Sequence, residues 1–255
     1  MPLATGWGAI EACAACADAI PDGEVIAVAE VVSQTPASGE SLTPAVQRLL
    51  TKHQGLAVRD TFAYLNKAFP ALSPDARLFA LILTLRTVCS GTTTFSADDI
   101  TRLRLEDPKA AVTEFHTAGW ADYSVSELLS APAQRPASVR VLRDADMRHD
   151  LQMGDRTRSR ASGWVTKSNS YRRLRNQGSA VKLASLFLAA HADPAGHIHV
   201  CTREIAVACA VRTEALPAVL DRLVASGWIE YLHTTDDQTV GQVDRSAQRF
   251  VPGAA

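Results

Sequence analysis

The sequence predicts a mainly α-helical protein with small β-hairpins, built as two modules of one kind after an N-terminal helical region. One order of elements occurs twice along the chain. Each occurrence begins with an apolar helix and a short β-prone stretch, and each ends in a Gly-Trp pair, Gly119-Trp120 and Gly227-Trp228. We divide the chain into residues 1–72, the helical N-terminal region; 73–150, the first module; 151–177, a basic connector; and 178–255, the second module.

In the N-terminal region, apolar residues recur at helical spacing: Leu49, Leu50, Phe62, Leu65 and Phe69. Residues 33–44 are rich in Ser, Thr, Pro and Gly, which is typical of a loop. This region carries no motif that assigns it a function.

The first module begins at Ser73-Pro74, where Ser is a good helix cap and Pro suits the first turn. Residues 76–88 are apolar on more than one face, which predicts a buried helix. Ser96 and Asp99 resemble a capping box with Asp in place of Glu. The remaining elements are expected to be a β-prone stretch at 92–95, helices at 96–105 and 107–119, and strands at 120–123 and 140–143 joined by a long turn containing Pro.

The second module repeats this order. Phe95 corresponds to Val200 and Ile100 to Ile205, and both Trp120 and Trp228 are expected in the core. The predicted elements are helices at 181–191, 202–211 and 213–226, strands at 197–200, 228–231 and 249–251, and a polar turn at 235–241.

The stretch TREIAVACAVRTEALPAVLDRLVASGWIEYL and its weaker twin SADDITRLRLEDPKAAVTEFHTAGWADY resemble winged-helix DNA-binding proteins such as regulators of the MarR and GntR types. The resemblance covers about residues 73–143 and 178–252. It implies two modules whose third helix enters the major groove and whose wing touches phosphates or the minor groove. The first copy departs from this pattern because its third helix is acidic. Two such modules in one chain also resemble the layout of plasmid replication initiators.

The resemblance points to candidate DNA contacts in both copies. In the second copy, Arg212 and Thr213 stand at the start of the third helix, where side chains reach base edges. Thr202 and Arg203 begin the preceding helix and suit phosphate contacts, and Arg222 lies off the buried stripe. The first copy offers Arg102, Arg104 and Lys109 among Glu106, Asp107 and Glu114, so it either touches DNA or serves dimerisation or protein contacts.

The connector carries the strongest charge signal. The net charge is −1, yet the span 156–182 holds eight basic and no acidic residues, which leaves 18 basic against 27 acidic residues, or −9, elsewhere. Such a separation favours a polyanionic partner. The alternative is a solvated basic loop, or a helix paired with acidic patches elsewhere. We expect phosphate contacts from the basic residues and the neighbouring tyrosine: Arg156, Arg158, Arg160, Lys167, Tyr171, Arg172, Arg173, Arg175 and Lys182.

No metal site, cofactor or enzymatic activity is expected. Cys13 and Cys16 have the spacing of half a zinc site without a second pair, so they fit an apolar helix face. His197, His199 and Cys201 share one strand face, and neighbouring residues on one strand rarely supply the tetrahedral ligands of a metal site. The chain lacks GxGxxG, P-loop, HExxH and GxSxG motifs, and no spacing nominates a catalytic triad.

The first twenty residues do not have the pattern of a signal peptide, and no apolar run approaches the ~20 residues that span a bilayer. Five cysteines without a disulfide spacing fit a reducing cytoplasm.

Together these features predict a cytoplasmic, nucleoid-associated protein that binds double-stranded DNA. Its predicted role is that of a sequence-specific transcriptional regulator, and a homodimer is a possible assembly. The first alternative is a replication initiator, or a telomere or plasmid maintenance factor, that binds repeated DNA sites. The second alternative is a winged-helix adaptor that binds other proteins.

Overall fold

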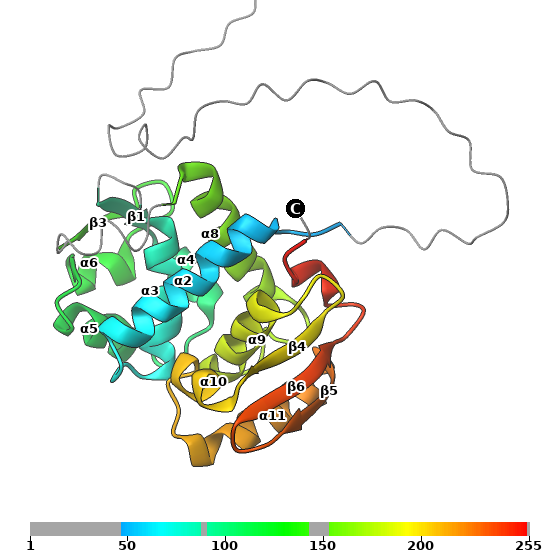
Figure 1. The fold of residues 1–255 in the computed structure, drawn as a ribbon. Coiled ribbons are helices and arrows are strands. Elements are labelled where there is room, and N and C mark those ends of the chain that lie inside the picture. The colour runs from blue at the N-terminus through cyan, green and yellow to red at the C-terminus, as the bar shows by residue number, and fades with distance from the viewer. Residues whose placement is uncertain (1–46, 88–90, 143–152, 254–255) are drawn as a thin grey trace, which may run out of the picture. The chain divides into compact units, whose positions relative to one another are not determined.

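The computed structural model describes residues 47–87, 91–142 and 153–253, and these lie in one compact unit, Val46–Ala255. The helices expected within residues 1–46, the Cys13–Cys16 pair and Cys89 lie outside the described residues. The described chain is mainly helical with two small antiparallel sheets of three strands each. This mixed α/β content, in which helices predominate, is compatible with the mainly helical class that the sequence predicts (Figure 1).

The first half of the unit contains one of the two sheets. Its strand order is β1-β3-β2, so β3, the last of these three strands in chain order, lies between the other two. Thr93 pairs with Val139, and Ala121 with Val141. In chain order the elements are α3 (Pro74–Arg86), β1 (Thr92–Phe95), α4 (Ala97–Leu103), α5 (Pro108–Thr117), β2 (Ala121–Asp122), α6 (Val125–Ser130) and β3 (Ala137–Val141).

The predicted helix starts of this half are confirmed. The Ser73 side chain accepts a hydrogen bond from the backbone of Ala76, with Pro74 as the first helical residue. Ser96 and Asp99 form a reciprocal capping box. The sequence did not predict α6, which replaces the expected long turn. Ser124 caps this helix, and its Leu128 is buried in the core.

The second half repeats the arrangement with strand order β4-β6-β5. Its third helix is preceded by a short 3₁₀ turn, η1, and the helix proper begins at Leu216 rather than at the expected Thr213. The elements are α9 (Ser179–His191), β4 (His197–Cys201), α10 (Thr202–Ala208), η1 (Thr213–Ala215), α11 (Leu216–Ala225), β5 (Ile229–Thr234) and β6 (Gln238–Val243).

The predicted hairpin of the second half was misplaced. The return strand is β6, in the stretch expected to be a polar turn, whereas the expected strand at 249–251 overlaps a 3₁₀ turn, η2 (Gln248–Phe250). The polar composition of β6 hides its alternation, in which Thr239, Gly241 and Val243 point inward. Gly241 is needed there, because an added Cβ would lie 2.4 Å from the carbonyl oxygen of Tyr231 on the neighbouring strand.

The two Gly-Trp pairs have the same role in both halves. Gly119 and Gly227 each adopt a φ of 74°, a left-handed conformation that ends the third helix. Trp120 and Trp228, which follow them, are buried, as the sequence predicts. The repeat in sequence therefore marks a repeated helix ending in the structure.

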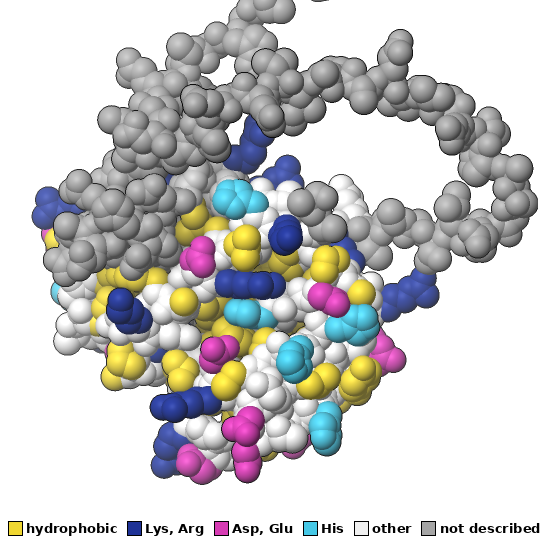
Figure 2. Space-filling model, in the orientation of Figure 1, with side chains coloured by type: hydrophobic (Ala, Val, Ile, Leu, Met, Phe, Trp, Pro, Cys, Tyr) yellow, Lys and Arg dark blue, Asp and Glu magenta, His cyan; other side chains and the backbone are white. Residues whose placement is uncertain are grey.

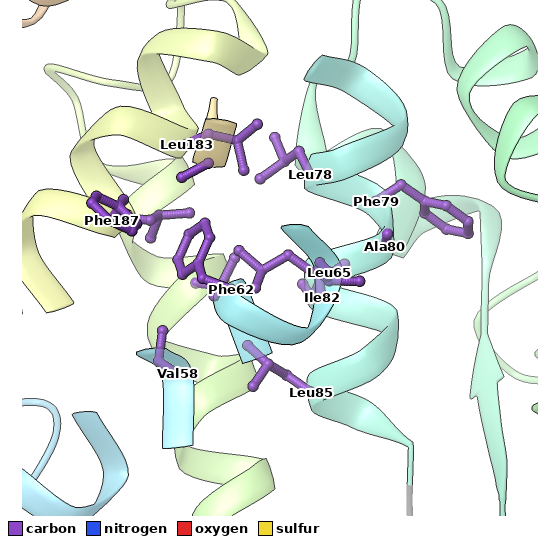
Figure 3. Packing of buried hydrophobic residues seen from close by; sticks show 14 of the residues in the cluster. Val58, Phe62, Leu65, Leu78, Phe79, Ala80, Ile82, Leu85, Leu183 and Phe187 are labelled. Atoms are coloured by element: carbon purple, nitrogen blue, oxygen red, sulfur yellow. The ribbon is translucent and has the colours of Figure 1, made fainter. Parts of the chain in front are cut away.

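Two further helices join the halves: α2 (Lys52–Ala68) and α8 (Asp155–Ser170). Helix α2 packs on α3, α8 and α9, so the described part of the N-terminal region belongs to the same core (Figure 1). Figure 3 shows how side chains of α2, α3 and α9 meet there. Phe62 of α2 and Phe187 of α9 stack edge to face at 5.5 Å. The two halves thus share one continuous hydrophobic core.

A buried lysine also joins the halves. Lys182 of α9 is fully buried, and its Nζ donates to the carbonyl oxygens of Leu103 and Arg104, 3.0 Å from each, at the end of α4. Lys182 therefore cannot contact DNA, which corrects the sequence prediction. Burial lowers the pKa of its ammonium to about 8.

This burial has a testable consequence for stability. Between about pH 8 and the ordinary lysine value of 10.5, the unfolded chain binds more protons at this residue than the folded protein does. Stability therefore rises with pH in that window. Relative to Lys182→Met, the wild-type free energy of unfolding should increase between about pH 8 and 10.5, by up to roughly 1.4 kcal/mol per pH unit.

Urea denaturation of both proteins at several pH values measures this difference. Lys67→Met, at an exposed position of α2, controls for the removal of a lysine as such. If the free energies of unfolding of wild type and Lys182→Met change with pH in the same way, or if that of wild type falls relative to the variant as pH rises, the buried position of Lys182 is contradicted.

Candidate nucleic-acid interface

Helix α8 separates the basic residues of its own sequence onto two faces. Arg156, Arg160 and Lys167 are exposed and follow one stripe at helical spacing, with Gly163 between them. Arg158, two positions after Arg156, lies on the opposite face and is 5% exposed. The connector is therefore largely an amphipathic helix, a form that the sequence analysis did not predict.

The exposed stripe forms one wall of a hollow of about 640 Å³. The segment Gln47–Leu49, just before α2, forms the other wall. Four of the lining side chains are cationic and none is a carboxylate: the lining consists of Gln47, Arg48, Leu49, Arg156, Ser159, Arg160, Gly163, Trp164 and Lys167. The hollow is therefore an anion-attracting concavity, which is the electrostatic feature that a phosphate-bearing partner needs.

Arg48 was missed by the sequence analysis because it lies more than a hundred residues from the connector. Its Nη2 donates to the carbonyl oxygen of Pro194 at 2.6 Å, and its Nη1 to those of Gln248 and Val251. Partial burial lowers the pKa of this guanidinium from its ordinary value. Contacts with three carbonyl groups fix the side chain at the edge of the hollow.

Backbone hydrogen bonds hold this wall against the end of the chain. Leu49 donates to Arg249 at 3.0 Å, and Gly253 donates to Leu50 at 2.9 Å. The indole Nε1 of Trp164 on α8 then donates to the carbonyl oxygen of Phe250 at 2.8 Å. Three segments far apart in sequence are thus joined by hydrogen bonds into one rim, which no local sequence pattern predicts.

Two predicted contacts besides Lys182 face the interior. The Arg158 guanidinium donates to the carbonyl oxygens of Thr87 and Met153. Thr202 is 4% exposed, and its hydroxyl donates to the carbonyl oxygen of Thr235 at 2.9 Å. Both side chains therefore stabilise the fold, and the expectation of phosphate contacts from them is wrong.

In the segment after α8, some of the predicted DNA contacts pack against the second module and others are exposed. The ring of Tyr171 packs against Trp228 and Phe250, at 5.6 and 5.3 Å. Arg173 donates to the carbonyl oxygen of Gly227 and, at 2.9 Å, to the carboxylate of Asp244. These residues attach the connector to the second module, whereas Arg172 and Arg175 are exposed.

In the second module the predicted reading positions are at the surface. Arg203, Arg212 and Thr213 are exposed, and Arg212 immediately precedes η1. In the first module Arg102, Arg104 and Lys109 are exposed; Arg104 donates to the side-chain oxygen of Asn176 at 3.0 Å.

The two third helices face one another across a second hollow, of about 400 Å³. Ala110, Ala111 and Glu114 of α5 line one side, and Val219 and Arg222 of α11 the other. Three further carboxylates line it, those of Asp75, Glu106 and Asp107. Arg222 therefore lies in acidic surroundings, which disfavour contact with a polyanion.

The face of the molecule drawn in Figure 2 has a mixed surface charge. Lys and Arg are interspersed there with Asp, Glu and His, on the part that is not grey. His197, His199 and Cys201 share one face of β4, as predicted, and on that face the two histidines are exposed. The described residues contain no group of three or more His, Cys, Asp or Glu side chains placed to hold a metal ion. None of the described helices has the length and apolar character required to cross a bilayer.

Comparisons with known proteins add no assignment. No protein-family model, no curated protein and no solved structure matches this chain.

Because Arg156 and Arg158 lie on opposite faces of α8, we expect their replacement to change the stability of the fold by different amounts. Arg158→Met should destabilise the fold by about 2–4 kcal/mol, because two buried carbonyl groups lose their donor. Arg156→Met, at an exposed position, should stay within about 0.5 kcal/mol of wild type. Thermal and urea denaturation of the two variants compares them directly. Equal stabilities would mean that Arg158 is not anchored inside.

Proposed function

We propose that this chain is a double-stranded DNA-binding protein with two winged-helix modules, acting as a sequence-specific transcriptional regulator. The observation that carries the proposal is the order helix, strand, helix, helix, strand, strand, which the second half shows and which the first half shows with α6 inserted between its last two strands. It is accompanied in both halves by a sheet whose last strand lies in the middle. This is the order implied by the resemblance to winged-helix proteins, whose third helix enters the major groove.

The exposed side chains at the start of the second and third helices of the second module support sequence reading. Arg212 stands just ahead of η1 and α11, where an arginine can bind guanine through two hydrogen bonds. Arg203, at the start of α10, suits a phosphate.

A specific observation favours a second candidate, a replication initiator that binds repeated sites. The two modules carry different side chains on their third helices, Lys109 and Glu114 on α5 against Asp221 and Arg222 on α11, and they are held in one arrangement by α8, the shared core and Lys182. Such a pair presents two different surfaces in fixed order. It therefore suits direct repeats or an asymmetric site better than the two halves of a palindrome.

The adaptor alternative draws support from the acidic hollow between α5 and α11. Carboxylates at the third helices repel nucleic acid and suit a basic protein partner. Absence of duplex binding at low salt would favour this alternative. A footprint would separate the first two candidates, since inverted repeats indicate a two-fold regulator and direct repeats an initiator.

The sharpest test concerns base reading by Arg212. Arg212→Ala should weaken binding to the preferred site by about 1–3 kcal/mol and relax preference at one base position, because a bidentate contact to guanine is lost. Binding-site selection on full-length wild type and variant measures both effects. Arg245→Ala, at another exposed position of the second module, is the matched control. If selection returns the same sequence for all three proteins, Arg212 does not read a base.

A further inference from the structure

We infer that the hollow between α8 and Gln47–Leu49 is a backbone-tracking site that binds successive phosphates of one strand of duplex DNA, independently of base sequence. This rests on the proposed function and assigns the phosphate contacts to residues outside both modules. The bound group is the phosphodiester of a polymer. A free phosphate ion and single-stranded nucleic acid are alternatives that the experiment below distinguishes.

Charge is the first argument. Arg48, Arg156, Arg160 and Lys167 line one concavity with no carboxylate among the lining residues. The face drawn in Figure 2 mixes charges where it is not grey, and the other hollow described above contains four carboxylates. Of the two hollows, the one at α8 therefore has the more favourable local potential for a polyanion.

Length is the second argument, and it favours a polymer. Arg156 and Lys167 are eleven residues apart on one helix, which corresponds to about 16 Å at a rise of 1.5 Å per residue. Phosphates of one DNA strand advance by about 3.4 Å per nucleotide along the axis. A stripe of this length extends past more than one phosphate of a strand, whereas a single phosphate group cannot contact both of its ends.

The chemistry of the lining favours duplex over single strand. Proteins that bind single strands supply aromatic rings on which bases stack. The aromatic residue of this hollow, Trp164, is only 1% exposed and its indole nitrogen is bonded to Phe250. The accessible groups are guanidinium, ammonium, the Ser159 hydroxyl and the Gln47 amide, which contact phosphate oxygens.

The site is also held open before binding. Arg48 is fixed by the carbonyl groups of Pro194, Gln248 and Val251. Opposite, the middle of the stripe is Gly163, where an added Cβ would meet no atom within 4 Å. A fixed cation and an open floor let a DNA strand lie against the helix with little rearrangement.

The open floor provides the experiment. Gly163→Glu introduces a carboxylate at the centre of the hollow, and Gly163→Gln introduces the same shape without charge. Ala63→Glu adds the same charge at an exposed position of α2. Binding of the full-length proteins to a fluorescein-labelled random-sequence 30-base-pair duplex is followed by anisotropy through a salt titration.

We expect Gly163→Glu to weaken duplex binding about tenfold or more at low salt, because a carboxylate then faces phosphates. Gly163→Gln and Ala63→Glu should stay within about threefold of wild type. A triple variant, Arg156→Ala/Arg160→Ala/Lys167→Ala, should reduce the slope of log K against log salt by about 2.7. Thermal melting establishes that each variant is folded, and the triple variant serves if Gly163→Glu does not fold.

Each contrary result has its own meaning. If wild type binds the duplex and both Gly163→Glu and the triple variant match it, the hollow is not a DNA site, while the proposed function stands. If wild type does not bind the duplex at low salt, the proposed function fails and this inference with it. Tighter, Gly163→Glu-sensitive binding of a single strand would overturn the duplex assignment. Competition by millimolar inorganic phosphate at constant ionic strength would overturn the polymer assignment.

Discussion

Helix α3 is apolar on every side, and the need to cover it organises the rest of the unit. Its residues from Ala76 to Leu85 are all buried, including Arg77. A helix that is hydrophobic all round must be surrounded, and α2, α5, α8 and α9 surround it. The second module supplies one of those covers through α9, which is itself almost entirely buried. Neither module therefore has a complete core without the other.

Mutual covering explains why three cations lie inside. Arg77, Arg158 and Lys182 are each less than 6% exposed. Removing a charge from water is costly unless hydrogen bonds replace the lost hydration. Each cation is held chiefly by carbonyl oxygens, such as that of Phe69 for Arg77, at places where helices end or neighbouring segments meet. These positions lie at the contacts between segments, so the buried charges fix how the segments meet.

Sequence reasoning succeeded where a local pattern decides the structure. The Ser73 and Ser96 caps, the Gly-Trp helix endings and the buried helices follow from short-range spacing. It failed where pairing decides, because β6 is too polar to be recognised by its composition. It also could not divide the connector, since Arg156, Arg158 and Arg160 look alike until the face that packs on α3 is known. Arg48 was beyond reach, because its place in the rim depends on contacts with residues 194–251.

The segment 156–182 therefore combines two tasks that its charge alone does not separate. Arg158, Arg173 and Lys182 bind the two halves to each other, through Thr87, Asp244 and the end of α4. Arg156, Arg160 and Lys167 remain at the surface beside Arg48. The same chain segment runs from this cationic hollow to Gly178 and Ser179, which line the acidic hollow between the third helices. A polyanion is attracted to the first hollow and repelled by the second. Under the proposed function, this difference in charge favours some orientations of a duplex over others before any base is read.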